Sequence, residues 1–187
     1  METFLLAQIL GAIGSTAFLI GVQLKNKRSI IIFLIFNTAV WTLAMFLVGA
    51  WSGMVTNTVT LIPALYAHHI NSQRGARANR SYIFAMWLLM FCCWLVTSMQ
   101  LIDILALVGS SFYMFSLFQK KSNAVRKLLL INQSAWIIYD FAMQIYTGAF
   151  FGVAIFVSTL VALYRYRADK PRKRKRYYYW HHHPTHR

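Results

Sequence analysis

The sequence predicts an all-α integral membrane protein with seven transmembrane helices, arranged as two parallel three-helix repeats joined by a linker helix. Three observations support this fold class. Of the 187 residues, 58% are apolar and 12% are charged. The apolar residues form blocks of about 15 to 21, long enough to cross a hydrocarbon core about 30 Å thick. All 19 lysines and arginines lie between or after these blocks, and the chain matches itself at a shift of 95 residues.

Each apolar block must satisfy its backbone hydrogen bonds internally in lipid, which favours helices, and no two-residue alternation suggests a barrel. The first block lacks the basic region and cleavage site of a signal peptide, so we expect it to remain as a helix. The later blocks are separated alternately by basic connectors and by short turns. In chain order the predicted spans are Phe4–Gln23, Ile30–Val48, Met54–Ile70, Tyr82–Ser98, Leu101–Phe118, Leu128–Tyr146 and Phe150–Tyr164.

The basic residues indicate the orientation. They lie in segments 25–28, 74–80 and 120–127 and after Tyr164, whereas the other connectors carry none. Cytoplasmic loops of membrane proteins are enriched in Lys and Arg. We therefore expect the carboxyl terminus in the cytoplasm and the amino terminus outside. Because these bases fix topology, the net charge of +15 does not indicate nucleic-acid binding.

The internal match defines the domain organisation. Identical residues occupy equivalent places on equivalent spans, with Asn37 on Asn132, Trp41 on Trp136 and Gly53 on Gly148. The expected units are a first repeat at 1–70, a cytoplasmic loop and linker helix at 71–100, a second repeat at 101–166 and a basic tail at 167–187. Parallel repeats of this kind place a solute site near the midplane, at their junction.

The basic tail contains Tyr177–Tyr179 and Trp180 among its lysines and arginines. Such a segment can associate with the anionic inner leaflet, by roughly 1 kcal/mol per base. The alternative is a disordered tail that only fixes topology. Its histidines lack Cys or carboxylate partners, so no metal site is expected.

One polar stripe on the sixth span is the main candidate for a binding site. Asn132, Trp136 and Asp140 recur at intervals of four residues and therefore share one helix face. Asn37 and Trp41 form the equivalent stripe on the second span. The asparagines could bind hydroxyl or amide groups while the tryptophans stack on the solute. Alternatively, the asparagines only join helices.

Two further positions depend on their surroundings. Asp140 is predicted to lie about 9 Å below the outer end of its span. There it would serve as a cation, proton or hydrogen-bond site. Alternatively, it would be a structural residue that is either protonated or paired, with Tyr139 or Gln144 nearby. Asn57 lies opposite Gly152 in the repeat alignment, and this glycine either leaves room for Asn57 or permits close helix packing.

No nucleophile–base set, zinc motif or phosphate-binding loop occurs in the sequence. We therefore expect no enzyme, no catalytic residues, no metal and no cofactor. The expected partners are the lipid bilayer and a small polar solute, without nucleic acid, and a homo-oligomer is compatible with the sequence.

The run LAQILGAIGSTAFLIG, the pair NTAVW and NQSAW, and the closing ALYRYR resemble the YgjV-like family of bacterial inner-membrane proteins, over about residues 4–167. This resemblance implies the bacterial inner membrane and no assigned activity. The three-one-three plan is also similar to the SWEET sugar facilitators and PQ-loop proteins, in which paired Asn and Trp residues handle the solute. The chain departs from that pattern because it has no Pro-Gln dipeptide and no proline in the first helix of either repeat.

The sequence therefore predicts a small carrier or facilitator of a polar solute, with Asn37, Trp41, Asn57, Asn132, Trp136 and Asp140 as its binding residues. The alternative is a non-transporting membrane protein that binds a partner or anionic lipid through its basic cytoplasmic face.

Overall fold

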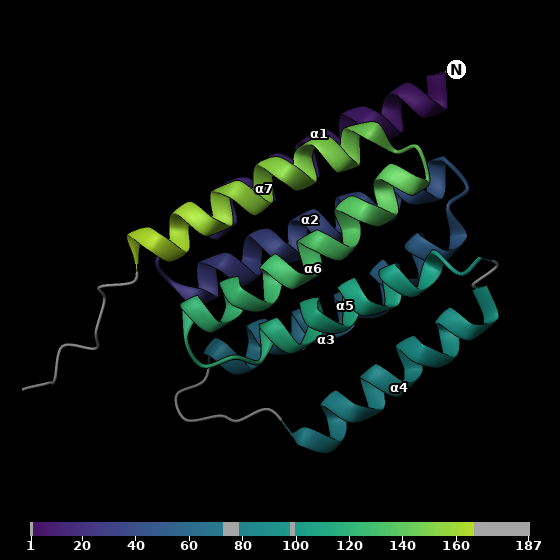
Figure 1. Ribbon diagram of the computed structural model, residues 1–187. Helices are drawn as coiled ribbons and strands as arrows, with labels where there is room; N and C mark the ends of the chain where they lie inside the picture. The colour runs from purple at the N-terminus through teal and green to yellow at the C-terminus, as the bar shows by residue number, and fades with distance from the viewer. Residues whose placement is uncertain (1, 73–78, 98–99, 167–187) are drawn as a thin grey trace, which may run out of the picture.

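The computed structural model describes residues 2–72, 79–97 and 100–166. Over these residues the chain forms seven α-helices and no strand (Figure 1). In chain order the helices are α1 (Glu2–Gln23), α2 (Lys27–Leu47), α3 (Trp51–Ser72), α4 (Arg80–Thr97), α5 (Asp103–Leu117), α6 (Ser122–Ala142) and α7 (Tyr146–Arg165). The predicted all-α fold class is confirmed.

The helices differ from the predicted spans mainly at their amino-terminal ends. α2 begins at Lys27 because the Asn26 side chain accepts a hydrogen bond from the backbone N–H of Arg28 at 3.1 Å, which caps the helix. α6 begins at Ser122, before the predicted start at Leu128, and so includes Arg126. Hydropathy locates only the apolar part of a span, whereas these helices continue into polar sequence.

The surface of the bundle has the character expected of helices in lipid. Helices α1, α2, α4 and α7 are long and apolar enough to cross a membrane by themselves, and α5 is a shorter apolar helix. Large apolar side chains lie on the outside, including Leu5 at 61% exposed and Phe150 at 73%. Helix α6 is less apolar and buries four strongly polar side chains, those of Arg126, Asn132, Gln133 and Asp140. The protein is an all-α membrane bundle.

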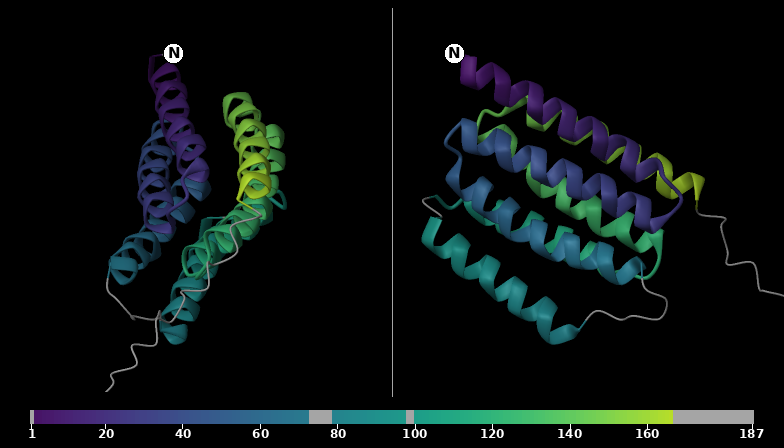
Figure 2. Two further views of the ribbon diagram at one scale, coloured as in Figure 1. Left: turned by 90° about the vertical axis from the view of Figure 1, so that its left-hand side faces the viewer. Right: turned by 180° about the vertical axis from the view of Figure 1, so that it is seen from behind.

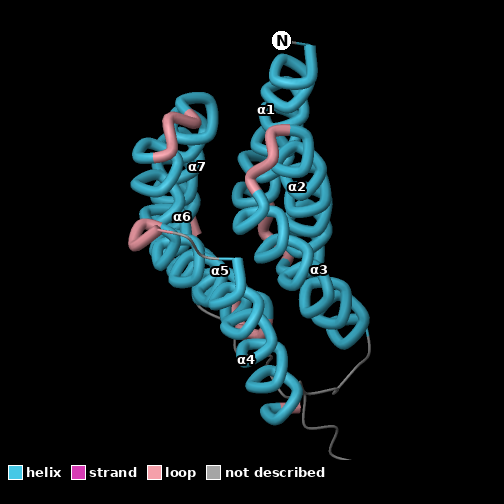
Figure 3. The backbone as a smooth tube through the Cα atoms, turned by 90° about the vertical axis from the view of Figure 1, so that its right-hand side faces the viewer, coloured by secondary structure: helices cyan, strands magenta, loops and turns pink. Residues whose placement is uncertain are grey.

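The helices form two layers. Helices α1, α2 and α3 make one layer, and α7, α6 and α5 make the other (Figures 2 and 3). The layers meet where α1 packs on α7 and where α3 packs on α5. Helix α4 lies at one edge and contacts α3 and α5. Helices α2 and α6 are therefore the central members of the two layers.

Two basic connectors lie together at one end of the bundle, which we call the basic end. The Ser122 hydroxyl donates to the Lys25 carbonyl at 3.0 Å, and the Asn123 side chain donates to the Tyr166 carbonyl at 3.0 Å. Segments 25–28 and 120–127 therefore share one side, as their charge predicted. Arg74, Arg77 and the tail 167–187 lie outside the described residues. Which membrane face the basic end occupies stays a prediction.

The larger apolar core fills the half of the bundle near the basic end. Its members include Val22, Ile30, Leu117 and Val125, all fully buried. A second cluster, built on Met90 and Met114, joins α4 to α3 and α5. The opposite end, at turns 48–50 and 143–145, is called the turn end. On the turn-end side, the interior between α2 and α6 contains side chains that do not belong to the apolar core.

Candidate functional site

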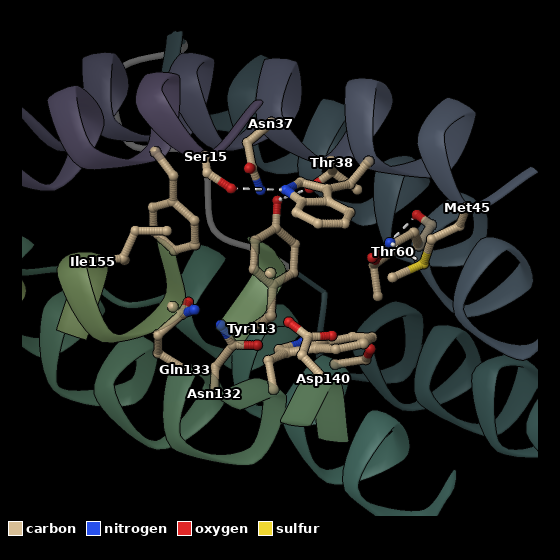
Figure 4. A pocket seen from close by; sticks show the side chains of 17 residues that line it. Ser15, Asn37, Thr38, Met45, Thr60, Tyr113, Asn132, Gln133, Asp140 and Ile155 are labelled. Carbon is tan, nitrogen blue, oxygen red and sulfur yellow. Dashed lines mark hydrogen bonds between the residues drawn. The ribbon is translucent and has the colours of Figure 1, made fainter. Parts of the chain in front are cut away.

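A polar cavity lies between the two layers of helices (Figure 4). Its volume is about 70 Å³, enough for about two water molecules at the roughly 30 Å³ that each occupies in the liquid. Described residues of every helix except α4 line it. They are Ser15, Phe18, Asn37, Thr38, Trp41, Met45, Asn57, Thr60, Ser110, Tyr113, Asn132, Gln133, Trp136, Asp140, Gly148, Gly152 and Ile155.

All six residues proposed from the sequence line this one cavity. Asn37 and Trp41 enter it from α2, Asn57 from α3, and the remaining three from α6. The helical spacing of four residues brings each set onto one face, and the packing of α2 opposite α6 brings the two faces together. The structure therefore gathers the predicted residues, and solute binding by them stays a prediction.

The two halves place these stripes against glycines in the same way. A Cβ atom at Gly14 would lie 3.2 Å from Cδ1 of Trp41, and one at Gly109 would lie 3.0 Å from Cδ1 of Trp136. Both tryptophans thus pack on a glycine in the first helix of their own half. These contacts recur at the shift of 95 residues and support the proposed repeat.

The same correspondence extends to the turn end of the cavity. A Cβ atom at Gly53 would collide with the Met45 sulfur, and one at Gly148 would lie 2.5 Å from Oδ2 of Asp140. Met45 and Asp140 are equivalent positions of the two halves, as are their glycines. At this end of the cavity, each helix pair therefore makes the same glycine contact, but only one of the two contacting side chains is a carboxylate.

Asp140 lies nearer the end of its helix than the sequence suggested. Helix α6 ends at Ala142, so Asp140 belongs to its last turn, and the predicted depth of about 9 Å is wrong. The predicted span ran on to Tyr146, but residues 143–145 form a turn in which Gln144 has a φ of 59°. Asp140 nevertheless remains only 6% exposed, because its carboxylate is directed into the bundle.

If Asp140 had only a structural role, Tyr139 or Gln144 was expected to be its partner. The Tyr139 hydroxyl instead hydrogen-bonds Asp103, and Gln144 is exposed. Oδ1 of Asp140 is buried without a hydrogen-bond partner. Asp103 is the first residue of α5, and its Oδ2 accepts from the backbone N–H of Gln100, before the helix, at 3.1 Å.

Two asparagine residues of the cavity lining, like Asp140, have a buried side-chain oxygen without a hydrogen-bond partner among the described residues. Oδ1 of Asn37 and Oδ1 of Asn132 are buried, and neither accepts a hydrogen bond. Both residues lie near the middle of their helices. Buried acceptors in proteins are normally paired, so unpaired oxygens on three residues that line one cavity indicate a place for a ligand or for water.

Asn57 and Gly152 do not form the complementary pair considered above. The Asn57 amide donates to the Met45 sulfur at 3.4 Å, within its own half. A Cβ atom at Gly152 would lie 2.7 Å from Ile137 and 3.1 Å from Nε2 of Gln133. The absent side chain of Gly152 therefore permits close packing of α7 on α6.

The floor of the cavity, toward the basic end, was not predicted. Phe18, Tyr113 and Ile155 line the cavity and also belong to the larger apolar core. The Tyr113 hydroxyl pairs with the Thr38 hydroxyl at 2.8 Å, which ties α5 to α2 below the asparagines. The core thus separates the cavity from the basic end.

The internal repeat offered a means of finding some of these residues. Ser15 is equivalent to Ser110, and Thr38 is equivalent to Gln133, and all of them line the cavity. A polar residue at both equivalent positions of an apolar sequence indicates an interior face. Tyr113 could not be found in this way, because its equivalent, Phe18, is apolar.

Arg126 is a second residue whose position the sequence did not reveal. It was counted with the connector bases, yet only 1% of it is exposed. Its Nε donates to the Val22 carbonyl at 2.9 Å and its Nη2 to the Leu24 carbonyl at 2.5 Å. Its guanidinium also lies 4.7 Å from the ring centroid of Tyr166. Arg126 therefore joins α6 and α7 to the carboxyl end of α1.

Three comparisons with known proteins add one finding. A family model described as "Bacterial inner membrane protein", with the name Imp-YgjV, matches residues 5–170. No curated protein and no solved structure matches the chain at a significant level. Over the described residues, no group of three His, Cys, Asp or Glu could hold a metal ion.

Proposed function

The chain belongs to the Imp-YgjV family of bacterial inner membrane proteins, and from this premise we propose that it is a carrier of a small polar solute. One observation supports the proposal above the others. Asn37, Asn132 and Asp140 line a single cavity inside a membrane bundle, and each carries a buried acceptor oxygen without a partner among the described residues. Unsatisfied polar groups are costly in lipid, so a purely structural bundle gains nothing by keeping them.

The position of the cavity suits transport. Its amide pair lies mid-helix on α2 and α6, the central helices of the two layers. Carriers built from repeats bind their solute near the midplane, at the junction of the repeats. In this arrangement Asn37 and Asn132 bind the solute, Trp41 and Trp136 flank it, and Asp140 tunes the entry from the turn end.

The apolar core gives this proposal a mechanical consequence. Phe18, Tyr113 and Ile155 close the cavity toward the basic end. A carrier must therefore separate the layers at that end to release its solute, which requires breaking the Thr38–Tyr113 contact between α2 and α5. We regard the structure as the conformation closed at the basic end.

Uptake into proteoliposomes tests the proposal, with a panel of sugars, nucleosides and small cations. We expect a saturable flux of at least one of these solutes. Asn132→Leu and Asp140→Asn should each lower that flux at least roughly tenfold, because each removes an acceptor from the site.

Two matched variants serve as controls. Asp103→Asn makes the same chemical change at a buried aspartate outside the cavity, and Thr159→Val removes a buried hydroxyl that bonds only within α7, to the Ile155 carbonyl. Both should preserve the flux. If no solute of the panel moves, or if both cavity variants transport like the parent, the carrier proposal is wrong.

The basic end favours a second candidate function. Exposed cations gather there, at Lys25, Arg28, Lys120, Lys121, Lys127 and Arg165. Such a surface can bind anionic lipid or an acidic partner. Deleting residues 169–187 should weaken that binding while leaving transport intact, whereas loss of transport on this deletion would argue against the separation of the two functions.

A further inference from the structure

We propose that the cavity binds a small organic cation that carries several N–H donors, of the guanidinium or alkylammonium class. The inference rests on the proposed carrier function and names the class of its solute. It goes beyond that function because a cavity lined by asparagine and tryptophan suits neutral solutes equally well. The charge and the acceptor groups of the site decide between them.

The first argument is charge. Asp140 is the one ionisable acid among the described lining residues, and none of them is Lys, Arg or His. Its carboxylate is buried, and its Oδ1 has no partner among the residues that the structure describes. A carboxylate is rare in a membrane bundle unless it pairs with a cation or faces water. Because the cavity supplies no cation of its own, a cationic solute is the natural counter-ion.

The second argument is that the fully buried lining atoms without a partner among the described residues are all acceptors. Several lining donors are already used within the protein. The Trp41 indole N–H donates to the Ser15 hydroxyl at 3.1 Å, and the Asn57 amide donates to the Met45 sulfur at 3.4 Å. The Thr60 hydroxyl donates to the Asn57 carbonyl at 2.9 Å. The buried lining atoms without a partner among the described residues are side-chain oxygens of Asn37, Asn132 and Asp140, which require a donor.

The third argument is the order of the acceptors along the cavity. Asp140 lies in the last turn of α6, and Asn132 lies two turns deeper, about 12 Å along the helix axis. The Asn37 amide faces the site from the opposite layer (Figure 4). A cation entering from the turn end would meet the carboxylate first and the two amide oxygens next. An asparagine amide can turn to donate or accept, so Asp140 sets the preferred sign of charge.

Aromatic residues and size add to the selection. Trp41 and Trp136 line the cavity between Asp140 and the asparagines, and indole faces attract cations, organic ammonium groups included. The volume of about 70 Å³ admits a few water-sized groups. A guanidinium or methylammonium ion fits this space, whereas a hexose does not fit without expansion of the site.

Guanidinium and urea provide the sharpest test, since they share a planar shape and nearly the same size but differ in charge. The full chain is reconstituted in vesicles of phosphatidylethanolamine and phosphatidylglycerol. Uptake of labelled guanidinium and of labelled urea is measured against protein-free vesicles, with methylammonium and potassium as competitors. Binding is followed independently by tryptophan fluorescence of the purified protein, which does not require transport.

We expect saturable guanidinium uptake, competition by methylammonium but not by potassium, and no protein-dependent urea uptake. Asp140→Asn should weaken guanidinium binding at least roughly tenfold, because a charged hydrogen bond becomes a neutral one. Asp103→Asn should leave binding unchanged. Both variants are first compared with the parent by gel filtration, so that a folding defect is recognised.

The outcomes separate the two proposals. If urea or another neutral solute is bound and transported while organic cations are not, the cation proposal is wrong and the carrier proposal stands. If potassium alone competes and is transported, the site is one for inorganic cations, and the organic class is wrong. If no member of the panel binds or moves, both proposals fail. Guanidinium binding unaffected by Asp140→Asn would also overturn the cation proposal, because the charge argument depends on that carboxylate.

Discussion

Arg126 makes the clearest structural prediction, because this buried cation joins three helices and has no acidic partner among the described residues. Its guanidinium donates to the Val22 and Leu24 carbonyls at the carboxyl end of α1 and to Oδ1 of Asn123 at 2.7 Å. The carbonyls at a helix carboxyl end have no partner within the helix and carry the negative end of its dipole. Arg126 satisfies them and neutralises that charge.

We expect Arg126→Met to lower the free energy of unfolding by about 3 kcal/mol. Hydrogen bonds from a charged donor contribute about 1.5–3 kcal/mol each, but polar contacts between membrane helices average only about 0.6 kcal/mol and reach about 1.7. The two bonds to α1 are charged and buried, so the upper part of the membrane range applies to each. Arg126→Lys should fall between the parent and Arg126→Met, since an ammonium cannot match the guanidinium fork.

Equilibrium unfolding in mixed micelles, followed by tryptophan fluorescence, measures these differences. Arg28→Met is the matched control, because Arg28 is an exposed base on α2 at the same end. Its effect should stay within about 0.5 kcal/mol. The reasoning is refuted if Arg126→Met is as stable as the parent, since the gain from removing a buried charge would then equal the loss of its bonds. An equal loss in Arg28→Met would show instead that any base at this end has the same effect.

Two further predictions concern the cavity and the orientation. Gly148→Ala places a Cβ 2.5 Å from Oδ2 of Asp140, so it should cost about 1–3 kcal/mol by overpacking and weaken guanidinium binding in the fluorescence titration. Gly53→Ala meets only the flexible Met45 side chain and should cost less, and an equal loss from both would contradict this explanation. A reporter enzyme that is active only outside the cytoplasm should be active when it is fused after Gly53. A reporter that is active only in the cytoplasm should be active when it is fused after Arg165. The reverse pattern would invert the proposed topology.

Much of the fold could be predicted because apolar blocks and basic residues can be located along the chain without knowing how the helices pack. All seven helices were expected, and the basic connectors 25–28 and 120–127 do lie together. Helix ends were less accurate. Arg126 was assigned to a connector because a base is usually excluded from lipid, but α6 accommodates it by giving it carbonyl partners on another helix.

The candidate site was partly predictable for a similar reason. The stripes on α2 and α6 follow from helical spacing alone, and the repeat relates one stripe to the other. Tyr113 and the floor of the cavity could not be found, because they depend on which faces of α1, α5 and α7 turn inward. The depth of Asp140 was wrong because a turn at residues 143–145 ends α6 early.

The sequence by itself determined the number of helices and put the basic connectors 25–28 and 120–127 at one end, because transferring a cation into lipid is costly enough to keep most bases out of the apolar blocks. Only the tertiary structure decided what the interior contains. It left the Asp140 and asparagine oxygens unpaired in one cavity and gave Arg126 its partners on α1. Hydrogen bonding acts over about 3 Å, so a partner depends on the rotation and packing of whole helices rather than on spacing along the chain.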